Sequence, residues 1–209
     1  MTLYAASKWM SNNLKKSFLS QYDIKVMDNG VDREIFKPTP GDLREKYNLE
    51  NKYVILGVSF VWSEKKGLDV FVELSKRLGK EYSIVLVGTN KKIARSLPDN
   101  IITIDRTHNQ MELAKIYTMA DVFVNPTRED TYPTVNMESI CCGTPVITFE
   151  TGGSPESVDA SSGSVVPCND IDALYEEIIR ICTQKPYTTE MCVEVGKRFD
   201  KTLKYNIDI

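Results

Sequence analysis

The chain has 209 residues, enough for one sizeable domain at roughly 100 to 200 residues per domain. Hydrophobic residues make up 42% of it and charged residues 26%, a composition typical of a soluble globular protein and not of a disordered or fibrous one. The net charge of -3 excludes a broad attraction for nucleic acid, and no apolar stretch approaches the roughly 20 residues of a membrane-spanning helix. The first residues also lack the pattern of a signal peptide, so we expect a cytoplasmic protein with no nucleic-acid partner.

Cysteine usage indicates a reducing compartment. The five cysteines are odd in number, and Cys141 and Cys142 are adjacent, which does not suit an ordinary disulfide framework. The adjacent pair could in principle form a metal or redox site, but the chain has no CxxC spacing and its single histidine, His108, is remote in sequence. We therefore expect both cysteines to be buried structural thiols, and we expect no metal site.

Short apolar, β-branched runs alternate with segments of helical periodicity along most of the chain. The predicted strands cover residues 25–27, 53–59, 83–87, 101–104, 121–124, 145–149 and 164–166. Apolar spacing over residues 68–78, 113–120 and 171–182 predicts helices, the last two with Asn109 and Asp170 as N-caps. This alternation predicts one α/β domain with helical ends, in which a Rossmann-like, mostly parallel sheet is covered by helices on both faces.

The segments that follow the predicted strands are polar, and several contain glycine. They cover residues 61–67, 88–90, 105–107, 125–130 and 150–154. In an open α/β sheet, ligands bind beyond the carboxyl ends of the strands, so we expect these segments to meet at one rim. Their charges, hydroxyl groups and flexible backbone suit a polar, phosphorylated ligand.

The densest chemical signal lies around a predicted helix that begins near Pro133. This residue suits the first turn of a helix, with Thr131 or Tyr132 as the cap. The N–H groups of Thr134 and Val135 would then form an anion site suited to a phosphate, since proline has no N–H to contribute.

Two acids bracket this anion site. Asp130 precedes the helix, Glu138 lies about one and a half turns into it, and Gly143 is placed to end it. Carboxylates cannot neutralise a phosphate, but they make charge-assisted hydrogen bonds with hydroxyl groups such as those of a ribose and a sugar. The alternative, from spacing alone, is a capped surface helix with solvated acids.

The same segment resembles the acidic motif of retaining glycosyltransferases of family 4, which have the GT-B fold. In that motif seven residues separate two acids, as they separate Asp130 from Glu138, and a helix end of the form Gly-Thr-Pro-Val-Ile follows, here residues 143–147. Segments similar to the family occur in the same order elsewhere, at residues 7–10, 29–32 with 36–38, 66–68, 117–124 and 151–156. The resemblance covers roughly residues 5 to 182, and its six ordered matches make it specific.

The resemblance implies two Rossmann-like domains that face a cleft, the C-terminal one holding a nucleotide-diphosphate sugar. All matched segments belong to that C-terminal half of a GT-B fold. We therefore expect residues 1–209 to form the donor-binding domain, with residues 1–21 near the interdomain hinge. The N-terminal acceptor domain is then absent from this chain, and the chain alone is expected to be inactive.

The implied activity is transfer of a hexose-type sugar from its nucleotide-diphosphate carrier to a glycan or lipid-linked acceptor, as in polysaccharide biosynthesis. Neither a metal ion nor another cofactor is implied. The full-length enzyme is expected in the cytoplasm, with peripheral association at the inner face of the membrane as an option. The alternatives are a non-catalytic nucleotide-sugar-binding or regulatory domain and, matching the motifs less well, a sugar-nucleotide epimerase on the same architecture.

The resemblance also implies roles for individual residues, with Lys66 and Asp130 as the catalytic ones. Lys66 matches the lysine that neutralises the diphosphate, with Lys65 beside it as a helper, and Glu138 matches the acid that binds the nucleotide ribose. Asp130 matches the acid that contacts the donor sugar. Because Glu129 precedes it, and the family usually has glutamate as the first acid, the sugar contact could belong to either of the two.

Further donor contacts are implied in the loops. Gly152 and Gly153 match the small-residue loop that lets the backbone approach the sugar or phosphate. Residues 105–107 fall where the base rests, and Arg106 is either a donor contact or, like His108, a surface residue. The remaining residues predicted to bind the donor surround the helix start: Thr131, Thr134 and Val135.

One region departs from the family pattern. The family commonly places an arginine five or six residues before the lysine, where this chain has Phe60 and Val61, so one diphosphate contact is expected to be absent. The neighbouring Trp62 is either a packing residue at the strand end or a wall of the donor pocket.

Overall fold

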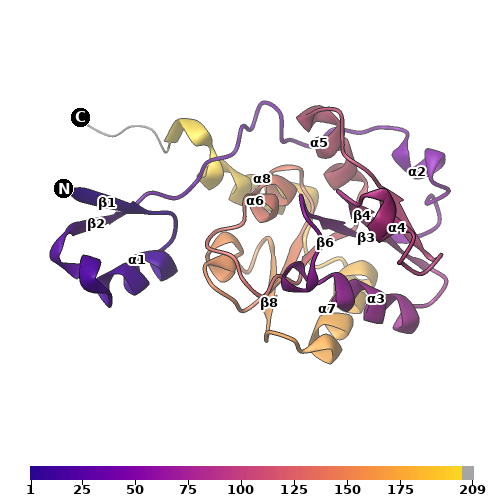
Figure 1. The fold of residues 1–209 in the computed structure, drawn as a ribbon. Coiled ribbons are helices and arrows are strands. Elements are labelled where there is room, and N and C mark those ends of the chain that lie inside the picture. Colours follow the sequence, from indigo (N-terminus) through magenta and orange to yellow (C-terminus); the bar gives the residue numbers. More distant parts are fainter. Residues whose placement is uncertain (204–209) are drawn as a thin grey trace.

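A parallel sheet of six strands forms the centre of the computed structural model, which describes residues 1–203 (Figure 1). The strands are β3 (Tyr53–Val58), β4 (Tyr82–Val87), β5 (Ile101–Ile104), β6 (Val122–Asn125), β7 (Val146–Phe149) and β8 (Gly163–Val166). Their order across the sheet is β5-β4-β3-β6-β7-β8, so the chain winds outward from β3 in one direction and then from β6 in the other. This doubly wound order confirms the predicted Rossmann-like fold.

Helices cover both faces of the sheet, as the sequence predicts. One face carries α5 (Gln110–Met119), α6 (Thr134–Cys141) and α8 (Thr189–Gly196), and the other carries α3 (Leu68–Arg77) and α7 (Ile171–Gln184). Side chains of β3 alternate between the two cores, because Val54 and Leu56 pack with the first group of helices and Ile55 with the second. Every residue of β6 and β7 is buried, as expected of strands covered on both faces.

Two of the predicted helix caps are confirmed. Asn109 caps α5, with its Oδ1 accepting a hydrogen bond from Glu112 N at 2.9 Å. Asp170 caps α7, with its Oδ1 accepting from Ala173 N at 2.9 Å. In both cases the side-chain oxygen satisfies an N–H group that has no partner inside the helix.

The start of α6 differs from the prediction, and neither Thr131 nor Tyr132 caps it. Pro133 occupies the cap position with φ -71° and ψ 117°, an extended conformation, so the chain becomes helical only at Thr134. Thr131 and Tyr132 therefore lie too early in the chain, and within the described residues no side chain caps this helix. Its end is as predicted, because Gly143 takes φ +84° and donates to Ile140 O at 3.0 Å.

Residues 1–26 form a separate small layer, here called the N-terminal unit, beside the main body of residues 27–203 (Figure 1). Its strands β1 (Thr2–Ala5) and β2 (Asp23–Val26) pair in parallel, and α1 (Lys8–Lys15) and a 3-10 helix (Phe18–Gln21) connect them. The sequence predicted a strand near β2 but a helical end in place of β1. β1 was missed because it is only four residues long and carries a single buried residue.

Short elements complete the main body. They are α2 (Leu43–Lys46), α4 (Lys91–Ala94) and 3-10 helices at Glu64–Lys66, Ser154–Ser157, Lys197–Phe199 and Lys201–Leu203. The end of the described chain returns to the segment that leaves the N-terminal unit, where Val31 N donates to Phe199 O at 2.7 Å. No helix within residues 1–203 has the length and apolar character needed to cross a bilayer.

Candidate functional site

The sheet changes winding direction between β3 and β6, which are hydrogen-bonded neighbours with Ile55 opposite Val122. The segments that leave these two strands at their carboxyl ends diverge, and the crevice between them is where doubly wound proteins bind ligands. Here the crevice brings together Lys66, from the segment after β3, and Asp130, from the segment after β6. Their charged atoms lie 2.7 Å apart although the two residues are 64 positions apart in sequence.

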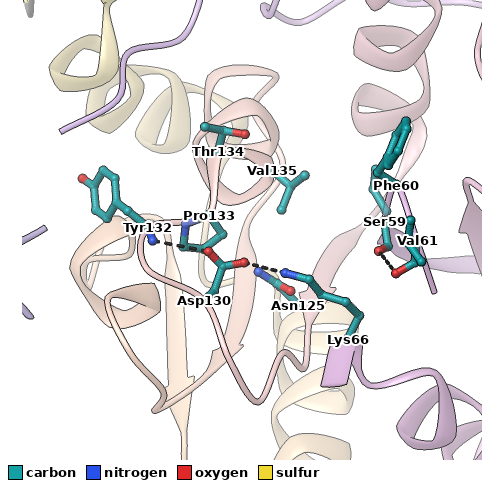
Figure 2. A pocket seen from close by; sticks show the side chains of 11 residues that line it. Ser59, Phe60, Val61, Lys66, Asn125, Asp130, Tyr132, Pro133, Thr134 and Val135 are labelled. Atoms are coloured by element: carbon teal, nitrogen blue, oxygen red, sulfur yellow. Dashed lines mark hydrogen bonds and ion pairs between the residues drawn. The ribbon is translucent and has the colours of Figure 1, made fainter. Parts of the chain in front are cut away.

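Three adjoining cavities line this edge of the sheet, with volumes of about 340, 390 and 690 Å³. The first and second share four lining residues: Val58, Ser59, Phe60 and Val135. The second and third share three: Val61, Lys66 and Asp130. The cavities therefore form one continuous groove, and most of the predicted site residues line it. Figure 2 shows the second cavity, at the centre of the groove.

An acid and a lysine face each other in the second cavity (Figure 2). Lys66 Nζ donates to Asp130 Oδ2 at 2.7 Å, and Tyr132 N approaches the other carboxylate oxygen at 3.3 Å. The Asp130 side chain is only 18% exposed, so the surrounding protein holds it in place. It lines both the second and the third cavity.

The neighbouring acid and lysine lie at the rim. Lys65 Nζ contacts Glu129 Oε2 at 2.6 Å, and the two side chains are 74% and 70% exposed. The hydrogen bond from Lys65 lowers the pKa of Glu129 below its usual range. Glu129 reaches the third cavity but not the second, so Asp130 is the acid that faces the centre of the groove.

Glu138 lies at the first cavity, on the second turn of α6. Tyr117 of α5 donates its hydroxyl to Glu138 Oε2 at 3.0 Å, and the Thr134 hydroxyl also bonds this carboxylate. Burial raises the pKa of Glu138, while the two hydroxyl groups act to lower it. The sequence predicted Glu138 but not its contact with Tyr117, which comes from another helix.

The first turn of α6 presents backbone N–H groups to the second cavity. Thr134 and Val135 line this cavity, and in the described part of the chain neither of their N–H groups has a hydrogen-bond acceptor. The positive end of the helix dipole and the Lys66 ammonium group therefore face the same space. This arrangement suits an anion such as a phosphate.

Gly152 and Gly153 serve close packing of the chain on itself. A Cβ atom at Gly152, whose φ is +53°, would lie 1.9 Å from Asp130 O, and one at Gly153 would lie 1.9 Å from Thr131 O. Gly153 is buried, and its N–H group donates to Asp130 O at 3.1 Å. Gly152 lines the third cavity together with Thr131. The two glycines thus hold the segment that carries Asp130, and only Gly152 borders the groove.

The region that lacks the family arginine contains an aromatic and a basic side chain in contact. The Arg106 guanidinium lies 4.8 Å from the centre of the exposed Phe60 ring, and both residues line the first cavity. Such a contact between a cation and a ring is attractive. Trp62 is buried, and its Nε1 donates to Val87 O at 2.8 Å, so it is a packing residue and does not line the groove.

The adjacent cysteines are buried, as predicted. Burial raises the pKa of Cys141 to about 12 and raises that of Cys142 as well, so both remain neutral thiols at neutral pH. Across residues 1–203, no group of three or more His, Cys, Asp or Glu side chains is arranged to hold a metal ion.

The fold matches one half of GT-B glycosyltransferase structures. It is similar to sucrose-phosphate synthase from Thermosynechococcus elongatus, with a TM-score of 0.84 and 22% identity over 97% of this chain and 55% of that one. It is also similar to HepE of Anabaena in complex with UDP-glucose, with a TM-score of 0.81 and 18% identity over 96% of this chain and 60% of that one.

Sequence comparison gives the family. The model described as glycosyl transferases group 1 matches residues 52–184, more than half of the chain, and the chain therefore belongs to this family. It is 28% identical to a GDP-mannose-dependent alpha-(1-6)-phosphatidylinositol monomannoside mannosyltransferase of Mycolicibacterium smegmatis, over 80% of this chain and 49% of that protein. It is 27% identical to a UDP-Gal:alpha-D-GlcNAc-diphosphoundecaprenol alpha-1,3-galactosyltransferase of Escherichia coli, over 82% and 48%. The chain thus spans about half the length of these relatives.

Proposed function

We propose that this chain is the donor-binding half of a retaining glycosyltransferase, which transfers a sugar from a nucleotide-diphosphate sugar to a hydroxyl group of a glycan or lipid-linked acceptor. The observation that carries the proposal is the arrangement of groups along the groove: Glu138 lines the first cavity, the start of α6 at Thr134 lines the second, and the paired Lys66 and Asp130 line both the second and the third. A nucleotide-diphosphate sugar presents hydroxyl groups, an anion and hydroxyl groups again along its length, which matches this arrangement. The names of both relatives include a nucleotide-activated sugar, which supports this donor class.

In this proposal each part of the donor has a complementary cavity. The ribose hydroxyl groups bond Glu138 in the first cavity, where Arg106 and Phe60 lie beside the base. The diphosphate lies in the second cavity, against the Lys66 ammonium group and the free N–H groups of α6. The sugar extends into the third cavity, where Asp130 accepts hydrogen bonds from its hydroxyl groups.

The chemistry of the proposed site is stabilisation of the leaving group. When the bond from the sugar carbon to the diphosphate oxygen breaks, its electron pair stays on the diphosphate. Lys66 and the N–H groups of Thr134 and Val135 are in place to stabilise that added negative charge, as preorganised donors do in other enzymes. An incoming diphosphate also competes with Asp130 for Lys66, which frees the Asp130 carboxylate for the sugar.

The acceptor side of the proposed enzyme lies largely outside this chain. Trp9 and Met10 of the N-terminal unit border the third cavity, on the side from which an acceptor would approach the sugar. We propose that an N-terminal domain binds the acceptor, that this chain alone is inactive, and that no metal ion takes part. A cytoplasmic enzyme that acts on a lipid-linked acceptor would work at the membrane surface.

Calorimetric titration of two variants with a nucleoside diphosphate and with its sugar tests the donor assignment. Glu138→Gln should weaken both ligands by about ten- to a hundredfold, because a hydrogen bond to a charged group contributes about 1.5 to 3 kcal/mol. Asp130→Asn should weaken only the nucleotide sugar and should leave the diphosphate unchanged or tighter, since Lys66 is then unpaired. Equal loss of both ligands in Asp130→Asn, or no loss in Glu138→Gln, would refute these roles.

Variants of Lys66 and of the neighbouring Lys65 test the contact with the diphosphate, one as the test and the other as its control. Lys66→Met should weaken the nucleoside diphosphate by about tenfold or more and leave the corresponding nucleoside unchanged. Lys65→Met removes only an exposed ion pair at the rim and should cost less than about fivefold. Similar losses in both variants would contradict a specific contact of Lys66. A transfer assay with the full-length polypeptide then separates an enzyme from a binding domain without activity.

A further inference from the structure

Tyr117 is a buried residue whose single polar side-chain atom contacts the candidate ribose-binding acid. Its side chain is fully buried in α5, and the hydroxyl donates to Glu138 Oε2 at 3.0 Å. The sequence places Tyr117 on the core face of a helix, where a phenylalanine would pack equally well. A buried hydroxyl group is costly unless it is hydrogen-bonded, and the partner of this one is Glu138, so the role of the Tyr117 hydroxyl is tied to that carboxylate.

The surrounding core fixes the position of this hydroxyl. The Tyr117 ring meets Phe123 edge-on, with ring centres 5.5 Å apart, and meets Phe36 in the same way at 6.3 Å. Thr144 Oγ1 donates to the backbone carbonyl of Tyr117 at 2.7 Å, which ties the end of α5 to the segment after α6. Because close-packed rings have little freedom, the hydroxyl is held at one point against Glu138.

The Glu138 carboxylate has no lysine, arginine or histidine paired with it in the described residues. Its neighbours are two hydroxyl groups, of Tyr117 and Thr134, and the neutral thiols of Cys141 and Cys142. Arg106 lines the same cavity, but its guanidinium lies over the Phe60 ring. A buried carboxylate without a cation depends on hydrogen-bond donors to stay ionised and oriented.

We propose that Tyr117 is a positioning residue for donor binding, which holds one oxygen of Glu138 so that the other faces the ribose hydroxyl groups in the first cavity. This inference rests on the proposed ribose-binding role of Glu138. Without the Tyr117 hydroxyl, the carboxylate would lose a fixed orientation and its charged form would be less favoured. Donor binding would then weaken, and it would weaken more at lower pH.

The test is Tyr117→Phe, which removes one oxygen and keeps the ring. Titration with a nucleoside diphosphate should show an affinity about tenfold lower near neutral pH, with a larger loss at about pH 5.5 than at about pH 8, since Glu138 is more protonated at the lower pH. Tyr187→Phe is the matched control, because the Tyr187 hydroxyl donates to Gly163 O at 3.0 Å, and Tyr187 borders none of the three groove cavities. Its affinity and pH profile should equal those of the unmodified chain.

The double variant, with Tyr117→Phe added to Glu138→Gln, shows whether the two residues act together in a double-mutant cycle. If Tyr117 acts through the Glu138 carboxylate, Tyr117→Phe should cause little further loss of affinity there. A Tyr117→Phe variant with a lower melting temperature but unchanged affinity and pH profile would overturn the inference, because Tyr117 would then be only structural. If Glu138→Gln itself binds the diphosphate normally, the ribose-binding role fails instead, and the two failures are therefore distinguishable.

Discussion

The main body and the N-terminal unit are both built from parallel strands and helices, but they bury their strands very differently. In the body, β6 and β7 have no exposed residue, whereas β1 and β2 together have a single buried residue, Ala5. The N-terminal unit also carries five exposed large hydrophobic residues: Met1, Tyr4, Trp9, Phe18 and Val26. Parallel strands are stable when both faces are covered, so the unit depends on contacts beyond its own two strands.

One such contact is visible at the start of α1. The carboxylate of Glu156 accepts hydrogen bonds from Lys8 N at 2.8 Å and from Trp9 N at 2.7 Å. Glu156 belongs to the 3-10 helix that directly follows Gly152 and Gly153. The segment that supports Asp130 therefore also holds the N-terminal unit against the main body.

The largest difference between the two regions should appear in global stability. Phe123→Ala removes a fully buried ring from β6 and should lower the free energy of unfolding by about 3 to 5 kcal/mol. Phe18→Ala removes a ring that is 82% exposed and should change it by less than about 0.5 kcal/mol. Urea unfolding followed by circular dichroism measures both, and comparable losses would mean that the N-terminal unit is part of the stabilising core.

An intermediate effect is expected at the connection between the regions. Glu156→Ala should speed amide exchange in α1 by about ten- to a hundredfold and leave β3 and β6 unchanged, since it removes charged acceptors from two N–H groups. Glu150→Ala, an exposed acid at the end of β7, is the control and should alter neither region. Uniform acceleration across the whole chain in Glu156→Ala would show that the unit and the body unfold together.

The smallest effect concerns pH and is confined to the main body. Burial raises the pKa of Glu138 in the folded chain, so the unfolded chain ionises first as pH rises from about 4.5. Folded stability should therefore decline from there up to the folded-state pKa and level off above it. Glu138→Gln lacks this decline, so the melting temperature of the variant should rise relative to that of the unmodified chain as pH rises. Parallel melting curves at all pH values would contradict a buried, ionisable Glu138.

Local sequence signals predicted most of the main body. The strands from β3 to β8 are apolar runs, and all lie within two residues of their predicted bounds. Asn109 and Asp170 cap their helices because a cap is a contact over a few residues. β1 was missed because it is only four residues long, and because its pairing with β2 is a contact between segments about 20 residues apart.

The candidate site was predicted only in part, because some of its contacts join segments that are far apart in the sequence. The family resemblance indicated Lys66, Asp130 and Glu138, and the structure brings all three to one groove. It could not indicate that Lys66 and Asp130 pair with each other, or that Tyr117 reaches Glu138, because these contacts depend on how α5, α6 and the strand ends pack. The predicted cap residues of α6 were wrong because Pro133 itself takes the cap position, and the helix begins one residue later, at Thr134.

The start of α6 makes the solvent composition matter to this protein. Because Pro133 leaves the amides of Thr134 and Val135 without a capping side chain, we expect these N–H groups to attract small oxyanions from solution. Under the proposed function, phosphate or sulfate buffers should stabilise the fold and weaken the apparent affinity for a nucleoside diphosphate, because both anions would bind the same N–H groups. Pro133→Ser would supply a capping hydroxyl to these N–H groups. The variant should therefore be more stable than the unmodified chain and less sensitive to the anions in the buffer, but it should also bind the donor more weakly.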